Sequence, residues 1–227
     1  MNLISRPPKK LFVEGSDDEH VITHLINALR PGLLKSLGEK FIETSGDDSQ
    51  AIKKFNLALK QSTPASIGIV IDADDQPKKQ LQDRWEALQQ SVQPHIAGDM
   101  PKKPPFEGWV CMTKTGLNVG IWIMPDNTQD GAIEKLLTSF VPEQDILWPF
   151  ALEVVEKAKN KGAKFRPQHE IKAQLHTWLA WSEEPGRPYG RAITCGDFIP
   201  HGSQAAEAFA KWFETLFVDQ DSEKELF

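Results

Sequence analysis

The sequence predicts a Rossmann-like α/β fold in which helices flank a mostly parallel sheet. Short β-branched runs alternate with longer segments whose apolar residues recur at helical spacing, and this βαβαβα order is typical of a parallel sheet. The run Ile67–Ile71 is apolar throughout, as expected for a central strand covered on both faces. From about residue 145 the periodicity is helical alone, which predicts a C-terminal helical extension.

The length and composition limit the classes of protein to consider. At 227 residues we expect an α/β domain over residues 1–145 and a helical region over 146–227 packed on it, as a separate unit or as one continuous domain. The net charge of -6 excludes a protein that binds nucleic acid by overall positive charge. Two cysteines are too few for a disulfide framework, which favours a reducing, cytoplasmic compartment. No apolar run reaches the roughly 18 residues that would span a membrane.

The first predicted unit is a strand followed by a helix. Lys10–Val13 has the composition of a short strand. Ser16 and Glu19 have the spacing of a capping box, with Ser16 as the N-cap. The helix is expected to end at about Leu29, because a Pro-Gly pair follows.

The helical spacing of this segment gives Asp18 a particular position. Asp18 precedes the apolar residues Val21 and Ile22 by three and four positions, so it is expected on their inward face, one turn from Glu14. Asp17 falls elsewhere on the helix. Surface acids at a helix start only complement the helix dipole, and an inward position for Asp18 indicates a further role.

The following segments continue the alternation of strands and helices. Two strands and two helices are predicted here, at Phe41–Thr44, Asp47–Lys60, Ile67–Ile71 and Gln76–Val92. A connection that contains Pro and Lys comes next and is expected to be exposed.

A β-hairpin and several helices complete the predicted elements. Two short strands around a Gly-containing turn form the hairpin, at Trp109–Met112 and Val119–Met124. A helix begins near Gly131. The C-terminal helices are expected at Leu147–Lys161, Gln168–Ser182 and Ser203–Phe217.

Acidic residues follow the predicted strands at the points where those strands end. Asp72 and Asp74 come directly after Ile67–Ile71, and alternation along an extended chain sends both side chains to the same side. Glu14 follows the first strand. Open α/β folds bind ligands at the carboxyl edge of the sheet, so these acids mark a candidate site there. Asp-x-Asp is also a frequent chance pattern, and an Asp at a strand end often only caps the next helix.

Three further residues are candidates for the same edge. Glu134 lies one turn into the helix that begins near Gly131, and Asp126 and Asn127 follow the second hairpin strand. Each also has a simpler interpretation, because Glu134 has the pattern of a surface glutamate and the other two are common turn residues.

Clustered carboxylates repel one another, so a cation is needed to neutralise them. Mg²⁺ is the usual choice in proteins, with Mn²⁺ as an alternative, because hard cations prefer oxygen ligands. A metal pair held by carboxylates in turn suggests phosphoryl chemistry.

The arrangement of these motifs resembles the Toprim domain of topoisomerases, primases and OLD-family nucleases. The resemblance rests on the Glu-Gly-x-x-Asp motif that begins at Glu14, a hydrophobic strand, and the pair Asp72 and Asp74 after it. It covers about residues 8–140. The segments Gly120–Asn127 and His169–Trp181 are similar to those of stand-alone Toprim-like proteins related to the OLD nucleases, which extends the resemblance to the C-terminus.

The resemblance implies Mg²⁺- or Mn²⁺-dependent cleavage of a phosphodiester bond in DNA or RNA, in phage defence or RNA processing. Glu14 matches the catalytic Toprim glutamate. Lys172 would place positive charge on the phosphorane, although a solvated helix lysine is the simpler interpretation. The metal ligands implied are Glu14, Asp18, Asp72, Asp74 and Glu134.

The sequence differs from the better-known Toprim proteins in ways that limit which class of Toprim protein it resembles. Tyr189 is the only tyrosine and is expected in a Pro-Gly-rich loop, which does not fit a topoisomerase nucleophile. The ATP-binding motif of common OLD nucleases is not in the sequence, so an ATPase partner would be a separate chain. The rival interpretation is a non-catalytic Toprim-like module that holds a metal, a phosphorylated ligand or a partner protein.

Basic residues gather in one part of the chain. Lys161, Lys164 and Arg166, next to Lys157 and Lys159, are the best candidates for contact with a nucleic-acid backbone, and otherwise are ordinary solvated charges. Because the chain is acidic overall, we expect a structured RNA substrate or a partner that delivers the nucleic acid.

Overall fold

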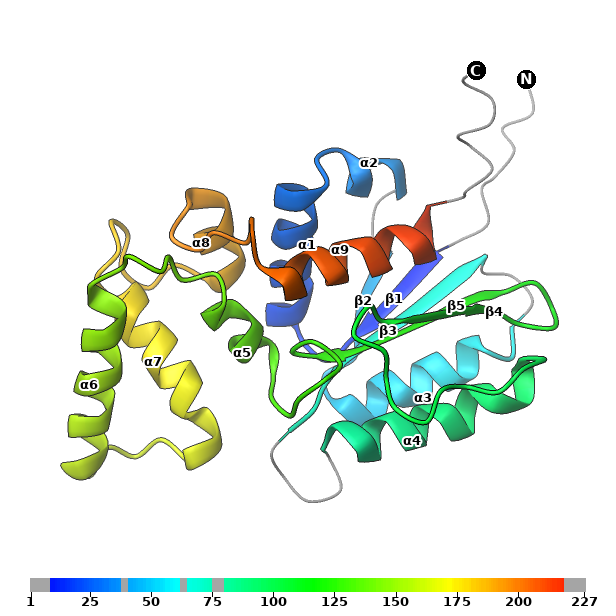
Figure 1. Cartoon of the computed structure of the whole chain (residues 1–227), viewed down its shortest axis with the longest axis horizontal. Coiled ribbons are helices and arrows are strands. Elements are labelled where there is room, and N and C mark those ends of the chain that lie inside the picture. Colours follow the sequence, from blue (N-terminus) through cyan, green and yellow to red (C-terminus); the bar gives the residue numbers. More distant parts are fainter. Residues whose placement is uncertain (1–8, 38–40, 62–64, 75–79, 219–227) are drawn as a thin grey trace.

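A five-stranded sheet forms the centre of the molecule, in the order β2-β1-β3-β5-β4 (Figure 1). Four strands are parallel and β4 alone runs antiparallel to its neighbour β5. This arrangement confirms the predicted α/β class with a mostly parallel sheet and the predicted hairpin. The strands are β1 (Lys9–Val13), β2 (Ile42–Thr44), β3 (Ser66–Asp72), β4 (Trp109–Met112) and β5 (Asn118–Met124).

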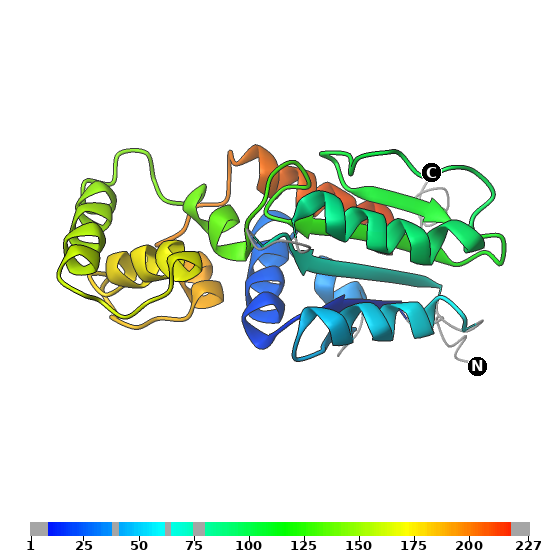
Figure 2. The ribbon, with the colours of Figure 1, turned by 90° about the horizontal axis from the view of Figure 1, so that it is seen from below.

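Helices cover both faces of the sheet, as Figures 1 and 2 show. On one face, α1 (Ser16–Leu29) and α9 (Gln204–Phe217) pack on side chains such as Leu11 and Trp122. On the other face, α3 (Asp48–Ala58) and α4 (Leu81–Val92) bury residues such as Phe12. Successive strand residues therefore point into two separate cores, which is why the central strands are apolar throughout.

The computed structural model of the protein describes residues 9–37, 41–61, 65–74 and 80–218. The helix predicted at Gln76–Val92 begins at Leu81 in the described part, and residues 75–79 lie outside it. Among the described residues, no helix combines the length and the apolar character needed to cross a bilayer.

The start of α1 differs from the prediction. Gly15, in an extended conformation, is the N-cap, and the carboxylate of Asp18 accepts a hydrogen bond of 2.7 Å from the Gly15 N–H. The predicted pair of Ser16 as N-cap and Glu19 as the capping acid is wrong. The chain becomes helical at Ser16, one residue earlier than expected, so that Asp18 takes the third helical position.

The segment after β5 forms a helical lobe beside the carboxyl ends of the parallel strands (Figures 1 and 2). α8, which the sequence pattern did not predict, packs so closely on α1 that a Cβ on Gly190 would lie 2.7 Å from the carbonyl oxygen of His20. The predicted helix Gln168–Ser182 is a short 3₁₀ turn, Pro167–His169, followed by α7. The remaining helices are α2 (Leu33–Leu37), α5 (Ile133–Thr138), α6 (Leu147–Asn160), α7 (Glu170–Leu179) and α8 (Tyr189–Cys195).

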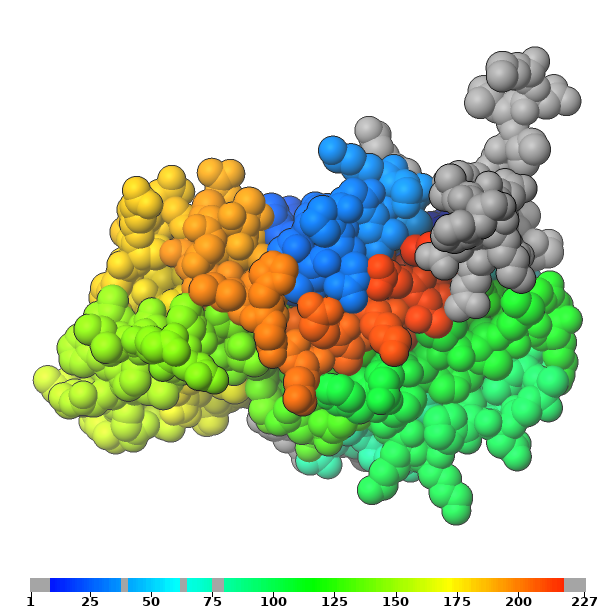
Figure 3. All heavy atoms as spheres, turned by 45° about the horizontal axis from the view of Figure 1, so that its top comes forward, coloured from blue at the N-terminus to red at the C-terminus, as the bar shows by residue number. Residues whose placement is uncertain are grey.

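The chain returns from this lobe to the sheet through α9, which lies between α1 and the β4–β5 segments in Figure 3. Gly68 and Gly120 face each other on β3 and β5. A Cβ on Gly120 would lie only 2.5 Å from Cδ2 of Leu216 in α9, and a Cβ on Gly68 would lie 2.7 Å from the same atom. The two glycines thus form a shallow depression that the Leu216 side chain fills.

We predict that Gly120→Ala lowers the free energy of unfolding by about 1–3 kcal/mol, because the added methyl group overpacks a filled core. Urea denaturation measures this loss. Gly98→Ala is the matched control, since nothing lies within 4 Å of its Cβ position, and it should change little. In the double variant Gly120→Ala/Leu216→Ala, the loss should be smaller than the sum of the two single losses. Additive losses would contradict the fit of Leu216 into this depression.

Candidate functional site

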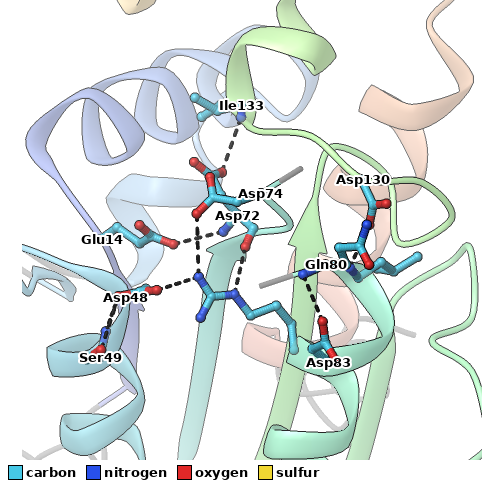
Figure 4. A network of polar contacts seen from close by, with 11 residues as sticks. Glu14, Asp48, Ser49, Asp72, Asp74, Gln80, Asp83, Asp130 and Ile133 are labelled. Atoms are coloured by element: carbon cyan, nitrogen blue, oxygen red, sulfur yellow. Dashed lines mark hydrogen bonds and ion pairs between the residues drawn. The ribbon is translucent and has the colours of Figure 1, made fainter. Parts of the chain in front are cut away.

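Two acids come together where β1 and β3 end. These strands are parallel neighbours, so Glu14, which follows β1, lies beside Asp72, the last residue of β3. The Asp72 N–H donates a hydrogen bond of 2.9 Å to Oε1 of Glu14 (Figure 4). The predicted meeting of these two side chains at the carboxyl edge therefore has a direct structural basis, since one strand end orients the carboxylate of the other.

A short backbone bridge brings a third segment to the same edge. Ala73 pairs with Gly131, and its N–H donates to the Gly131 carbonyl at 3.0 Å. Two residues later, the Ile133 N–H at the start of α5 donates a hydrogen bond of 3.2 Å to Oδ1 of Asp72 (Figure 4). Glu134 follows directly, so its approach to Asp72 is set by the backbone.

Two adjoining cavities share this edge of the sheet. One, of about 290 Å³, lies over the β1–α1 turn, and the other, of about 220 Å³, opens between the strand ends and the start of α7. Asp72, Glu134 and Lys172 line both of them. The first also contains Glu14, Gly15, Ser16, Asp17, Asp18, Gly46 and Ile133, and the second contains Asp74, Gly131, Ala132, Lys135, Gln168, His169 and Ile171.

Burial and mutual repulsion raise the pKa values of the central carboxylic acids. Burial, together with the negative charge of Asp18, raises the pKa of Glu14 to about 7. Burial, with a contribution from Glu134, raises the pKa of Asp18 to about 6. The pKa of Asp72 is raised well above its usual value by burial first and then by Asp18, Glu14 and Glu134. The edge is therefore a place where added positive charge would be strongly stabilising.

Lys172 is the cation that the lobe contributes to these acids. From α7, its Nζ lies 3.3 Å from Oε1 of Glu134 and 3.8 Å from Oδ2 of Asp17. The sequence pattern placed Asp17 away from the site, but the structure places it at the rim of the larger cavity. Lys172 thus faces the acids, with 41% of its side chain exposed.

Two more side chains of the lobe lie beside this lysine, and sequence reasoning missed both. The rings of His176 and Tyr189 stack with centroids 4.9 Å apart. Burial, with the charge of Lys172, lowers the pKa of His176, and burial with Glu134 raises that of Tyr189. His176 follows Lys172 by one helical turn, which is the signal that could have identified it.

Arg84 and Asp48 form the other pair that sequence reasoning missed. Both are 7% exposed, and a guanidinium nitrogen of Arg84 donates to the carboxylate of Asp48, a contact drawn as a dashed line at Asp48 in Figure 4. The same nitrogen, Nη2, also lies 3.8 Å from Oδ2 of Asp74. Arg84 falls between Leu81 and Leu88 on the apolar stripe of α4. A charged residue within such a stripe is the signal that would have found it.

Asp126 and Asn127 are not among the residues that line the two cavities. The amide oxygen of Asn127 accepts a hydrogen bond of 2.7 Å from the Ile123 N–H. The carboxylate of Asp126 accepts hydrogen bonds from Thr128 and Gln129 within its own turn. Both side chains are occupied in shaping the turn after β5.

Of the basic residues, Lys157 and Lys159 are engaged in ion pairs with glutamates of the lobe. Within the described part of the chain, Lys161, Lys164 and Arg166 make no ion pair, and all three are exposed. They lead into the turn whose Gln168 and His169 line the smaller cavity.

The carboxylates fit a hard divalent cation by their chemistry. Glu14, Asp18 and Asp72 each accept one backbone N–H, which orients the group and leaves its second oxygen. Oxygen donors of this kind suit Mg²⁺ or Mn²⁺. In the described ranges, no group of three or more acidic, histidine or cysteine side chains is arranged as it stands to hold a metal ion. Binding would require these side chains to turn inward together.

We predict that the protein without divalent ions loses stability as the pH rises from about 4.5 to 7. The unfolded chain releases the Glu14 proton near its ordinary pKa, whereas the folded protein keeps that proton until about pH 7. Above pH 7, the raised pKa of Glu14 therefore costs about 3 kcal/mol of unfolding free energy.

Urea denaturation in EDTA at pH 5 and pH 8 measures this change. Glu14→Gln should lessen the drop and be more stable than the wild type at pH 8. Glu153→Gln, in an exposed ion pair on α6, is the control and should keep the wild-type profile. An unchanged pH profile in Glu14→Gln would contradict the assignment.

Comparisons with known proteins place the chain in one family. No curated protein and no solved structure matched it in the corresponding searches. A family model described as "Protein of unknown function (DUF3226)" matches residues 8–218. The matched segment includes both cavities and every candidate site residue named above. The chain therefore belongs to the DUF3226 family.

Proposed function

We propose that the protein is a metal-dependent phosphodiesterase of the Toprim type that cleaves DNA or RNA. The observation that carries this proposal is the convergence of Glu14, Asp18, Asp72 and Glu134 on a cavity that also contains Lys172. These acids come from three separate segments at the carboxyl edge of a parallel sheet, where α/β folds bind ligands. The order of the acidic motifs along the chain supports the same conclusion.

The protein side chains would divide the chemistry among them. Mg²⁺ or Mn²⁺, when bound, lowers the pKa of a water ligand and polarises a phosphoryl oxygen. Glu14, Asp18, Asp72, Asp74 and Glu134 are the residues proposed to hold it. Glu14, with a pKa of about 7, would accept a proton at neutral pH. The ammonium group of Lys172 would stabilise the negative charge that develops on the phosphate.

The exposed cations of residues 161–166 support a nucleic-acid substrate. Lys161, Lys164 and Arg166 stand next to the turn that lines the smaller cavity, so a phosphate backbone held by them would pass the acids. We further propose that the protein acts in the cytoplasm with an ATPase on a separate chain, in phage defence or RNA processing. The cytoplasm is proposed from the small number of cysteines, and the ATPase partner and the biological role from the likeness to OLD-type proteins.

A non-catalytic module is the second candidate, and two observations favour it. Lys172 already pairs with Glu134, and no metal site is preformed among the described residues. Such a module would hold a metal, a phosphorylated ligand or a partner without turnover.

The proposal predicts cleavage that requires both a divalent ion and Asp72. Plasmid, single-stranded DNA and tRNA are incubated with the protein in Mg²⁺, Mn²⁺ or EDTA. At least one substrate should be cut with metal, and Asp72→Asn should abolish the cutting, because this carboxylate lines both cavities. Asp126→Asn, an acid of the turn after β5, should cut normally. If Mg²⁺ raises the melting temperature of the protein but no substrate is cleaved, the result would favour the non-catalytic module.

Lys172→Gln should lower kcat by roughly 10²–10³, the range seen when one preorganised stabilising donor is removed. The rise in melting temperature on adding Mg²⁺ should persist, because Lys172 is not proposed to hold the metal. Lys164→Gln is the matched control, with a raised KM and nearly unchanged kcat. A Lys172→Gln protein that is inactive and also no longer stabilised by Mg²⁺ would point to a structural role for this lysine.

A further inference from the structure

We infer that Arg84 is a positioning residue, which clamps the end of β3 from α4 and thereby fixes the two acids of the Asp-x-Asp motif. This inference deepens the proposed function, since it explains how the same site keeps its geometry. It concerns a side chain that is not among the residues lining either cavity.

The guanidinium of Arg84 contacts the motif at two points. Its Nε donates a hydrogen bond of 3.2 Å to the backbone carbonyl of Asp72. Its terminal nitrogen Nη2 lies 3.8 Å from Oδ2 of Asp74. The planar fork of arginine permits both contacts at fixed geometry, which a lysine could not reproduce. Between the two contacted residues, Ala73 makes the bridge to Gly131 that leads to Glu134.

Asp48 binds the same terminal nitrogen of the arginine that lies near Asp74. Its carboxylate accepts from Arg84 and also takes a 2.7 Å hydrogen bond from the Ser49 N–H at the start of α3. Arg84 and Asp48 are both 7% exposed, so the pair ties α3, α4 and β3 together out of contact with most water. A buried pair of this kind adds little net stability but is costly to break on one side.

The main effect of the pair on the site is geometric rather than electrostatic. Arg84 and Asp48 have opposite effects on the pKa of Glu14, the arginine lowering it and the aspartate raising it. Because the two charges oppose each other, the cluster gains little countercharge from Arg84. The hydrogen bond to the Asp72 carbonyl and the ion pair with Asp74 remain as its contribution.

The test separates this role from simple stability. Arg84→Met leaves Asp48 buried without its cation, and the melting temperature should fall by something on the order of 10 °C. The double variant Arg84→Met/Asp48→Leu removes both charges and should recover most of that loss. If Arg84 clamps the strand end, the recovered protein should still have a loosened Asp-x-Asp segment.

Hydrogen exchange without added metal measures that loosening. In the double variant, the amides of Ala73 and Gly131 should exchange on the order of tenfold faster than in the wild type, while the rest of β3 stays protected. Asp48→Asn, which keeps Arg84 and its bond to Asp72, is the control and should retain wild-type exchange at these two amides. Wild-type protection in the stable double variant would overturn the inference.

A measurement of metal binding tests whether the contacts of Arg84 matter for the proposed chemistry. Mn²⁺ titrated calorimetrically should bind the double variant on the order of tenfold more weakly than the wild type, as for other residues that orient metal ligands. Equal Mn²⁺ affinity would overturn the positioning role. A wild-type protein that binds no Mn²⁺ would refute the proposed function alone, because the exchange measurement decides on Arg84 independently.

Discussion

The repulsion among carboxylates buried at one edge of the sheet is the constraint on which the site depends. Glu14 and Asp72 approach each other because β1 and β3 are parallel neighbours, the first turn of α1 adds Asp18, and burial makes their charges costly. Backbone N–H groups partly offset this cost. Those of Gly15, Asp72 and Ile133 each donate a hydrogen bond to one carboxylate. These donors set the orientation of the acids, but they carry no full charge. The remaining negative charge is what makes a cation the natural ligand here.

Cations enter this arrangement from two sides and do different things. On the open side, Lys172 reaches Glu134 from a helix that belongs to the lobe, so its position depends on how the lobe sits against the sheet. On the closed side, Arg84 is locked between Asp48 and the end of β3. A half-exposed lysine can change partners when a ligand arrives, whereas a buried arginine cannot do so without leaving a charge unpaired. Lys172 is therefore suited to a role in the chemistry, and Arg84 is suited to holding the site in place.

Local patterns revealed those parts of the molecule that depend on neighbouring residues in the chain. The strands, the hairpin and the acids at strand ends follow from periodicity, and Glu14 and Asp72 meet because parallel strands end at one edge. Asp17 was misplaced because it joins the cavity beside Lys172 of the distant helix α7, a contact that helical spacing within α1 does not encode. Arg84 and Asp48 are partners separated along the chain by β3, and no local pattern encodes such a pair. The same applies to α8, whose seven residues are held by packing on α1 more than by propensity.

The return of α9 to the sheet ties the order of synthesis to the order of assembly. Leu216 seals the depression formed by Gly68 and Gly120, yet it is made long after both strands have left the ribosome. Until then, one face of β3 and β5 lacks its cover, and so do the aromatic side chains that pack beneath α9. The edge carrying the acids can reach its final form only when the chain has been made at least as far as Phe217. Partly synthesised protein is thereby kept without a finished site, whatever that site acts on.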